Sequence, residues 1–436
     1  MTLARRLTES LASLGVRLGD AVGVACSGGA DSVALLHLLR RSPLAAGVTV
    51  LHVDHGLHEA SASHAEFVAE LASVWDMKCE VMRVKVKPGG SIEAAARDAR
   101  YQALSDAASR HGLSFVATAH TLDDQTETVL MRLQRGGSLA AISPSLGVFI
   151  RPLLDVRRIA LREWLSAEGL VWCEDPTNDD LRFERNWTRN VVLPLLRERR
   201  SGIDEVLART AARAREDEEA LDALAGDVLS RAQTDDVGIL LTGLDLEAQP
   251  RAIRSRVVIA ALRLLGADPS HTDIDAIIGG STRHECGPVS VWSIDDGLAF
   301  IREPVAVPEP VLLDQNQSLG AWGIRVRKAM TTDTPPWRWR CRVPGDSSNM
   351  TIRSRRPGDR VLTAAGTKKV QDVLVDAKVP RPLRDLVPIL ATGDEALAVV
   401  GLTHRPQETA TVINDGVIDV TPSTSSWSRG AVWNRN

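Results

Sequence analysis

Two adjacent glycines near the start of the chain are flanked by hydroxyl and carboxylate side chains, in the string Ser-Gly-Gly-Ala-Asp-Ser at residues 27–32. Because glycine has no Cβ, the backbone at Gly28 and Gly29 can take positive φ and bring its N–H groups close to an anion. Asp31 is a candidate ligand for magnesium. A plain strand–turn–helix corner is the alternative interpretation, but the glycines, hydroxyls and carboxylate all suit one anion-binding mechanism. We therefore expect this segment to bind phosphate.

A second group of candidate residues consists of three carboxylates, Asp123, Asp124 and Glu127. They follow the apolar run 115–119, which predicts a buried strand, and they open a predicted helix. Acidic side chains in a first helical turn interact favourably with the helix dipole, so a capping role stays open. Asp124 and Glu127 are three residues apart and share a helix face. At the carboxyl end of a strand in the same sheet as the glycines, the three carboxylates could hold magnesium and an amine.

The elements that must position these residues are short apolar runs that alternate with helical patterns, which is typical of a parallel sheet in an α/β protein. The runs lie at residues 22–26, 48–53, 80–86 and 114–120. In doubly wound sheets ligands bind beyond the carboxyl ends of the strands, where Ser27 and Asp54 fall. The spacing of His52, His55 and His58 also permits a zinc interpretation, although a strand that runs into a turn would point them in different directions. Contacts of His52 and Asp54 with adenosine are favoured.

The composition is that of a globular protein with room for two or three domains. The chain has 436 residues, of which 44% are hydrophobic and 25% are charged. No run approaches the length of a membrane span, and the N-terminus lacks the apolar core of a signal peptide. The five cysteines are scattered and never form a C-x-x-C pair, which argues against a disulfide framework, a zinc ribbon and an iron–sulfur site. We therefore expect a cytoplasmic protein without a membrane partner.

Charge is segregated along the chain, although the net charge is only −4. Residues 204–236 hold ten acidic and four basic residues, whereas residues 352–384 hold nine basic and three acidic ones. Residues 182–200 hold six basic and two acidic ones. A basic helix is either a solvated face or a contact with a nucleic-acid backbone, and charge alone weighs the two equally.

The patterns predict three domains and a tail. An α/β catalytic domain is followed by a helical middle domain that ends in a hairpin near residues 288–301, and then by a small, basic α+β domain. In the last of these, alternating Trp and Arg at residues 337–342 indicate a half-buried strand first and an RNA-facing arginine row second. Little apolar content at the end indicates a disordered tail. The boundaries are expected at residues 1–202, 203–310, 330–420 and 421–436.

The string at residues 27–32 resembles the pyrophosphate-loop (PP-loop) signature of ATP pyrophosphatases, and the lack of a following Lys excludes a Walker A loop. Further blocks in the same order resemble one family of this class, the tRNA(Ile)-lysidine synthetases. These blocks are Leu-His-Val-Asp-His-Gly-Leu at 51–57, Glu-Ala-Ala-Ala-Arg at 93–97 with Arg100-Tyr101, Ala-Thr-Ala-His at 117–120 with Asp-Asp-Gln-Thr-Glu-Thr at 123–128, and Glu-Asp-Pro-Thr-Asn at 174–178 with Arg185-Asn186. The chain departs from the family at Thr121, where a second histidine is frequent, and at His58, where arginine is common.

The resemblance implies a Rossmann-like PP-loop domain and an ATP-dependent ligase. In the implied reaction, ATP adenylates the ring carbonyl of the wobble cytidine in a tRNA(Ile) with the anticodon CAU, and free L-lysine displaces AMP to give lysidine. ATP and Mg²⁺ are the implied cofactors. The basic C-terminal domain is implied to recognise the acceptor end of the tRNA.

The residues carried over by motif fall into four sets. The catalytic residues are Asp31, Asp124 and Glu127, with Asp31 also as the metal ligand and with Asp124 and Glu127 as the lysine site. The ATP site is Ser27, Gly28, Gly29, Ala30, Asp31, Ser32, His52 and Asp54. The tRNA site is Arg185, Asn186, Arg189, Asn190, Arg353, Arg355, Arg356, Arg360, Lys368 and Lys369.

Two other functions stay open. A 2-thiocytidine synthetase would activate the same carbonyl but deliver sulfur, and it would be expected to carry paired cysteine motifs, which this sequence lacks. The other is a non-catalytic RNA-binding protein that keeps the ATPase fold without the activity. The presence of Ser27, Asp31, Asp124 and Glu127 argues against this alternative. The sequence does not determine the oligomeric state, and a homodimer stays an open alternative.

Overall fold

The computed structural model describes most of the chain and divides it into two compact units, Met1–Glu219 and Ala220–Asn436. The described residues are 2–44, 47–56, 61–84, 92–174, 180–242, 246–294, 297–313, 318–319, 324–328, 339–343, 349–363, 365–403 and 416–422. Within them, no helix is both long and apolar enough to cross a membrane. The division between the units falls at 219/220, whereas the sequence analysis expected a boundary at residue 202.

A six-stranded sheet forms the centre of the first unit, and four of its five strand pairings are parallel. The order is β3 (Lys78–Arg83), β2 (Val48–Asp54), β1 (Val22–Ala25), β4 (Phe115–Ala117), β6 (Phe149–Ile150) and β5 (Ser145–Leu146). Only β5 pairs antiparallel, with β6. The predicted Rossmann-like parallel sheet is confirmed, and the carboxyl ends of β1, β2 and β4 meet at one edge.

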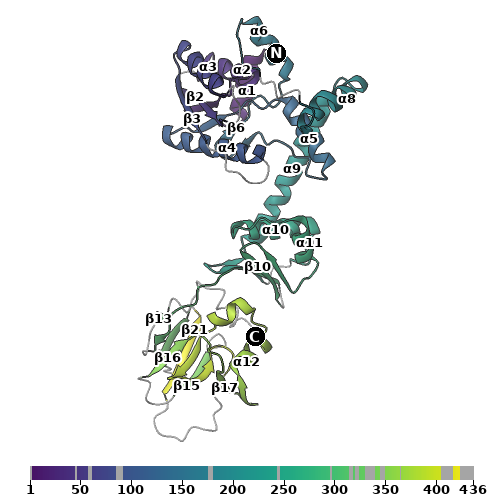
Figure 1. The fold of residues 1–436 in the computed structure, drawn as a ribbon. Helices are drawn as coiled ribbons and strands as arrows, with labels where there is room; N and C mark the ends of the chain where they lie inside the picture. Colours follow the sequence, from purple (N-terminus) through teal and green to yellow (C-terminus); the bar gives the residue numbers. More distant parts are fainter. Residues whose placement is uncertain are drawn as a thin grey trace. The chain divides into compact units, whose positions relative to one another are not determined.

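Helices cover both faces of this sheet (Figure 1). They are α1 (Leu3–Ser13), α2 (Ala30–Arg40), α3 (Ser61–Val74), α4 (Ile92–His111) and α6 (Arg158–Ala167). Helix α5 (Leu122–Gln134) follows β4 and instead packs through Val129 against Ala211. On one face, α1, α2, α3 and α6 share a core that includes Val24, Val33 and Leu161. On the other face, α4 packs through Leu104 against Val116. The helix that begins at the glycine segment and the helix of the Arg100-Tyr101 motif therefore lie on opposite faces.

Further helices follow in the basic segment 182–200. They are α7 (Glu184–Trp187), one turn of π-helix (Thr188–Val192), α8 (Leu193–Arg199) and α9 (Ile203–Leu229). A π-helical turn inside a helix is rare and is often found at functional sites. The acidic helix α9 runs through the boundary between the two units.

The first part of the second unit combines helices with a sheet. Helices α10 (Arg251–Leu264) and α11 (His271–Ile278) pack on an antiparallel sheet in the order β7 (Gln233–Thr234), β8 (Gly238–Thr242), β11 (Gly297–Arg302), β10 (Val289–Ile294) and β9 (Arg283–Cys286). The β10–β11 hairpin was predicted, but β7, β8 and β9 were not. The middle domain is therefore not purely helical, because the helices bury their apolar faces on this sheet.

The last part of the second unit consists of short strands with two short helices. One sheet has the order β12 (Val311–Leu312), β16 (Met350–Arg353), β19 (Ile389–Thr392), β20 (Glu395–Val399), and another has β13 (Ser318–Leu319), β14 (Ile324–Lys328), β21 (Gly416–Pro422), β15 (Trp339–Val343). The hairpin of β17 (Arg360–Thr363) and β18 (Gly366–Lys369), helix α12 (Val370–Asp376) and a 3₁₀ helix (Arg381–Leu386) complete it. The small α+β domain was predicted.

The strand predicted at residues 337–342 and the predicted tail both fall in this part of the chain. The predicted strand at 337–342 is confirmed over residues 339–342 as part of β15, while residues 337 and 338 lie outside the described part. The predicted tail was wrong at its first two positions, because Thr421 and Pro422 pair with β14 as the end of β21. Residues 423–436 lie outside the described part.

Candidate active site

The glycine segment forms a tight turn between β1 and α2, and only one of its glycines needs the conformational freedom that the sequence suggested. Gly28 has φ +91°, which side-chain-bearing residues rarely adopt. Gly29 instead has φ −73° and is the N-cap of α2, so it does not use the positive φ that a glycine can take. The hydroxyl of Ser32 accepts the N–H of Ser27 at 3.2 Å and donates to the carbonyl of Gly29 at 2.9 Å. These bonds connect the two sides of the turn to the N-terminus of α2.

The start of α2 offers both free donors and a carboxylate. The first N–H bonded within the helix is that of Val33, to the carbonyl of Gly29, so the N–H groups of Ala30, Asp31 and Ser32 have no partner within the helix. Such donors and the helix dipole favour an anion. Asp31 Oδ2 accepts Nε of Arg158 at 3.0 Å, whereas its buried Oδ1 has no hydrogen-bond partner. Burial raises the pKa of Asp31, and Arg158 counteracts this effect.

The start of α5 uses one carboxylate for two purposes. Thr121 is the N-cap, and its hydroxyl accepts the N–H of Asp124 at 3.4 Å. Asp124 Oδ2 accepts both the N–H and the hydroxyl of Thr121, at 2.8 and 2.7 Å, which completes a capping box. The capping alternative is therefore realised through one oxygen. The other oxygen, Oδ1, faces Arg158 and Arg185, each at 2.8 Å. The structure also gives Thr121, a departure from the family pattern, a role as helix cap.

Six charged side chains meet between these two helix starts, and we call them the carboxylate–arginine cluster. They are Asp31, Asp124, Glu127, Arg158, Arg185 and Arg189. The fully buried Glu127 accepts Arg185 Nε at 2.7 Å, Arg189 Nε at 2.7 Å and Arg158 Nη1 at 3.3 Å. Three formal negative charges are thus balanced by three positive charges.

Arg158 is the central residue of the cluster, although no sequence motif had indicated it. It contacts Asp31, Asp124 and Glu127, which come from α2 and α5. These carboxylates raise the pKa of Arg158 well above its usual value, against the effect of burial. Burial alone would raise the pKa of Asp124, but Arg158, Arg185 and the bonds from Thr121 lower it to about 2. The contacts within the cluster thus favour the charged forms of Asp124 and Arg158.

The four residues predicted to contact tRNA in the segment 182–200 do not share one environment. Arg185 and Arg189 point inward to the carboxylates, so their guanidinium groups are engaged in the cluster. Asn186 is buried and donates to the carbonyl of Asp180 at 3.0 Å. Asn190 is exposed. A direct contact with tRNA thus fits Asn190 best, while the two arginines lie beside the predicted reaction site.

Asp123 takes part in a different network from its neighbour Asp124. It accepts the N–H of Arg158 at 2.8 Å and Nη2 of Arg197 at 2.8 Å, and Arg197 also bonds the fully buried Asp204 of α9. This network ties α5 to α6, α8 and α9. The expectation that all three carboxylates form one group holds only for Asp124 and Glu127.

His52 and Asp54, predicted to contact adenosine, lie at the end of β2 with protein partners. Nδ1 of His52 lies 2.8 Å from the carbonyl of Cys26, and burial lowers the pKa of His52. Asp54 accepts Ser61 Oγ at 2.6 Å and the N–H of Gly56 at 2.8 Å, and these bonds lower its pKa. Their contact with adenosine stays a prediction. His58 lies outside the described residues, within which no group of three His, Cys, Asp or Glu side chains is arranged to hold a metal ion.

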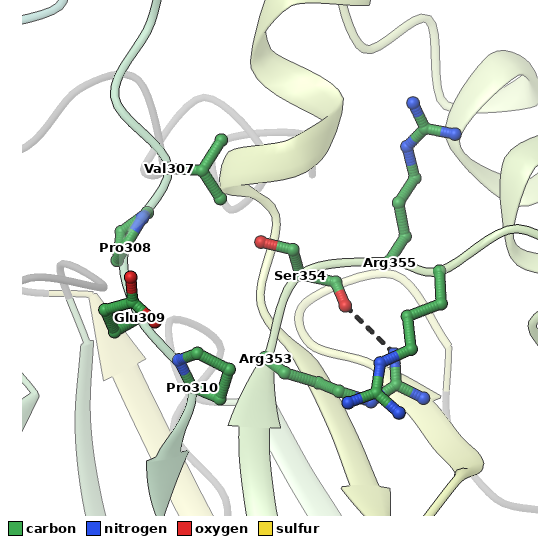
Figure 2. Close-up of a pocket in the computed structure, with 8 residues that line it drawn as sticks. Val307, Pro308, Glu309, Pro310, Arg353, Ser354 and Arg355 are labelled. Carbon is green, nitrogen blue, oxygen red and sulfur yellow. Dashed lines mark hydrogen bonds between the residues drawn. The ribbon is translucent and has the colours of Figure 1, made fainter.

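In the second unit, a turn that carries three of the predicted tRNA-binding arginines lines a cavity of about 280 Å³ with residues 307–310 (Figure 2). Arg353 is only 2% exposed and bonds both oxygens of Asp359, at 2.7 and 3.0 Å. Arg355 pairs with Asp385 and Arg356 with Asp394. Figure 2 shows the bond from Arg353 to the carbonyl of Ser354, and Arg355 directed away from Pro308 and Pro310. The buried Arg353 holds the turn together, which does not support its predicted contact with tRNA.

The remaining predicted cations lie on the β17–β18 hairpin. Arg360 and Lys369 are exposed, and Lys368 pairs with Asp376 of α12. Arg360 and Lys369 are directly opposite each other in the antiparallel register. Two cations therefore project from adjacent strands, as a contact with an RNA backbone would require.

A turn with a free helix start, set against a cluster of carboxylates at the end of a parallel sheet, defines a nucleotide-binding α/β protein of the PP-loop class. The family model described as a PP-loop domain matches residues 1–196, and the model described as a TilS substrate C-terminal domain matches residues 350–412. The chain is 36% identical over 415 residues to the tRNA(Ile)-lysidine synthase of Deinococcus radiodurans and 33% identical over 457 residues to that of Symbiobacterium thermophilum. The chain belongs to the tRNA(Ile)-lysidine synthase family.

The matches differ in how much of each relative they cover. They include 92% of this chain in both cases, but 62% of the Deinococcus radiodurans protein and 94% of the Symbiobacterium thermophilum protein. The Deinococcus deserti protein, at 35% identity, is covered over 66% of its length. The predicted family and PP-loop fold are confirmed.

Proposed function

We propose that this chain is an ATP-dependent carbon–nitrogen ligase that joins free lysine to the wobble cytidine of a tRNA(Ile) with the anticodon CAU. The observation that carries the proposal is the carboxylate–arginine cluster, because Asp124 and Glu127 lie in it together with Asp31 of the turn proposed to hold phosphate. Membership of the tRNA(Ile)-lysidine synthase family supports the same reaction.

The first step is activation of the base. The ring carbonyl of cytidine is a poor electrophile, and its oxygen becomes a leaving group once it has attacked the α-phosphate of ATP and expelled pyrophosphate. The N–H groups of Ala30, Asp31 and Ser32 at the start of α2 are free to hold the departing pyrophosphate. The partnerless Oδ1 of Asp31 suits a magnesium ion, which would neutralise phosphate charge when bound.

The second step is attack by the amine of lysine. The nitrogen forms the new bond to the ring carbon, the bond to the adenylate oxygen breaks, and AMP leaves. Asp124 and Glu127 supply the negative charge that an ammonium group needs, but guanidinium groups hold both. Lysine binding therefore requires that an ammonium replaces a guanidinium, with Arg158 the candidate since it bonds all three carboxylates. The ammonium must also lose a proton before attack.

The proposed sulfur-delivering alternative finds less support. Cys26, next to the turn, is buried, and burial raises its pKa to about 11, so the thiol stays protonated at neutral pH. Burial also raises the pKa of Cys173, whose N–H donates to the carbonyl of Gly28. A thiolate nucleophile is not favoured at either position.

The proposal is tested by incubating the full chain with a CAU-bearing tRNA(Ile) transcript, ATP, Mg²⁺ and labelled lysine, followed by nucleoside mass analysis. Lysidine, AMP and pyrophosphate should form in equal amounts. Asp31→Ala should abolish pyrophosphate release while tRNA binding survives. Asp106→Ala, an exposed carboxylate on α4, is the matched control. Absence of lysine-dependent AMP formation by the unaltered chain would refute the proposed reaction.

A further inference from the structure

Two arginines of α4 lie over the ring of Tyr101, in a motif that the proposed reaction leaves without a role. Cζ of Arg97 lies 5.0 Å and Cζ of Arg100 lies 5.6 Å from the ring centroid. The ring meets Phe149 of β6 edge-on, with centroids 4.8 Å apart. Arg151 follows that strand directly. We call Arg97, Arg100 and Arg151 the Tyr101 arginine group.

Among the side chains that the structure describes, which do not include Glu93, the Tyr101 arginine group has no counter-charge, unlike the carboxylate–arginine cluster. Among the described residues, no carboxylate forms an ion pair with any of its three guanidinium groups. Arg151 is only 4% exposed, and Nη1 donates to the carbonyl of Ser143 at 2.7 Å while Nε has no partner. Buried or half-buried positive charge without a partner is costly. An anion would relieve this cost.

Neighbouring titratable groups respond to the same positive potential. The guanidinium groups of Arg151 and Arg97 lower the pKa of Tyr101, although burial alone would raise it. Burial, together with the three arginines, lowers the pKa of His120 to about 3, against the opposing charge of Asp124. Burial is the largest cause of the His120 shift, whereas the Tyr101 shift is caused by the arginines against burial and indicates that negative charge is favoured here.

The position of the group separates it from the phosphates of ATP. Helix α4 packs on the face of the sheet opposite to α2, whose N-terminus is the expected phosphate site. Arg97 is exposed and Arg100 is half-buried, so the group is open to solvent on its own side. Arg100 is nevertheless close enough to Arg185 of the carboxylate–arginine cluster for the two charges to interact. A ligand here would approach the reaction site from the side away from the PP-loop helix.

We propose that the Tyr101 arginine group binds a phosphodiester of the RNA substrate beside the reactive nucleotide. The proposal rests on the proposed function, because it needs a base in RNA to react at the cluster. A base that reacts in an enclosed site must leave its stack, which brings its flanking phosphates against the protein. Guanidinium groups match phosphate oxygens in a bidentate geometry, and Arg97 and Arg100 are presented together by one helix.

The test compares the double variant Arg97→Gln/Arg100→Gln of the full chain with Arg110→Gln. Arg110 lies at the other end of the same helix and pairs with Glu80, which also bonds His111. Dissociation constants for the CAU-bearing tRNA(Ile) transcript are measured over a range of KCl concentrations. Loss of two phosphate contacts should reduce the slope of log K against log [KCl] by about 1.4, with no change for Arg110→Gln. The charge-conserving Arg97→Lys/Arg100→Lys should keep most of the slope.

The outcomes separate this proposal from its alternatives. A slope in the double variant equal to that of Arg110→Gln overturns it. An increased KM for lysine or for ATP with an unchanged slope also overturns it, since the anion would then be the carboxylate of the amino acid or a phosphate of the nucleotide. If the wild-type chain forms no lysidine but the slope falls as expected, the RNA site stands and the proposed reaction fails. The single variants, each expected to lose half the effect, serve if the double variant does not fold.

Discussion

Arginines predicted to bind RNA occur in two regions, and the two regions hold them differently. In the carboxylate–arginine cluster, the predicted Arg185 and Arg189 share their carboxylates with Arg158, which contacts three carboxylates from two helices. Asp31 keeps one oxygen without a partner. In the turn of the second unit, Arg353 is matched with one carboxylate six residues away and is almost fully buried. The first arrangement can exchange partners when a charged ligand arrives. The second is closed and serves the fold.

A run of arginines in a sequence therefore does not tell which guanidinium groups lack a carboxylate partner. What distinguishes the two regions is the number of carboxylates that share each arginine and the chain distance between them. A local pair such as Arg353 and Asp359 forms with the turn itself. Arg158 meets Asp31 across 127 positions, so their contact exists only after the sheet has assembled.

The largest effect is expected from Glu127→Gln in the carboxylate–arginine cluster. The amide would leave Arg158, Arg185 and Arg189 short of one negative charge in a buried place. Lysidine formation should fall by about 10²-fold or more, and the free energy of unfolding of the first unit should drop by about 3–5 kcal/mol. Nucleoside mass analysis and calorimetry measure the two effects.

The matched control for this variant is Glu184→Gln, which removes a carboxylate that pairs with Arg135 at the surface. It should leave activity near the wild-type level, because an exposed pair contributes about 0–1 kcal/mol. Activity of Glu127→Gln equal to that of the control would show that the cluster is structural rather than part of the reaction site.

A smaller effect, confined to stability, is expected from Arg353→Met in the turn. Asp359 would lose its buried partner, which should destabilise the second unit by about 3–5 kcal/mol. Calorimetry of the full chain should show the transition of that unit at lower temperature. Below that transition, binding of the tRNA transcript should match wild type.

The neighbouring Arg356→Gln is the control for the turn, since Arg356 is half exposed and its partner Asp394 is almost fully exposed. Its effect on stability should be below about 1 kcal/mol. Should Arg353→Met weaken tRNA binding while the second unit remains folded, the buried arginine would have a role in recognition that its geometry does not suggest.

The pH dependence of stability also distinguishes the two regions, because among the described histidines the strongly shifted His120 lies in the first unit, near its cluster. The pKa of His120 is lowered from 6.5 to about 3. Between these two pH values the imidazole is therefore protonated in the unfolded chain and neutral in the folded chain. Stability from this group is complete above pH 6.5 and is lost as the pH falls toward 3, by up to about 1.4 kcal/mol per pH unit. His120→Asn should make the curve for the first unit flatter over this window.

Burial also lowers the pKa values of His37, His52 and His55, which contribute to the same window. The measured quantity is therefore the difference in slope between His120→Asn and wild type, in urea denaturation at several pH values. Parallel curves would show that His120 is protonated in the folded chain, contrary to the expected neutral form.

The parts of the molecule that sequence predicted are those determined by local pattern. The strands β1, β2 and β4, the turn at Gly28 and the shared face of Asp124 and Glu127 follow from apolar runs, a residue without Cβ and helical spacing. They need no knowledge of distant contacts.

The parts that sequence missed depend on tertiary contacts. Arg158 acquires its partners only because α6 packs on α2. Asp123 bonds Arg197, which also bonds Asp204, and these contacts exist only because α8 and α9 lie against the start of α5. A signal for Arg158 was present in the sequence, because Arg157 and Arg158 stand together at the start of a helix, where helix-dipole interactions favour acidic residues instead. The sheet strand β8 was missed because its apolar run is short and flanked by acidic turns.

The smallest effect is expected from the exposed Arg360 and Lys369 of the β17–β18 hairpin. They test whether cations that, unlike Arg353, have no carboxylate partner among the described residues contribute to RNA binding. Arg360→Gln/Lys369→Gln should leave the stability of the second unit unchanged and should reduce the salt dependence of tRNA binding by about one to two units of slope. Lys378→Gln, on the same part of the chain, is the comparison variant. An unchanged slope in the double variant would show that the RNA-binding surface of the second unit does not include this hairpin. Whether an arginine has a carboxylate partner would then have no bearing on RNA recognition in this unit.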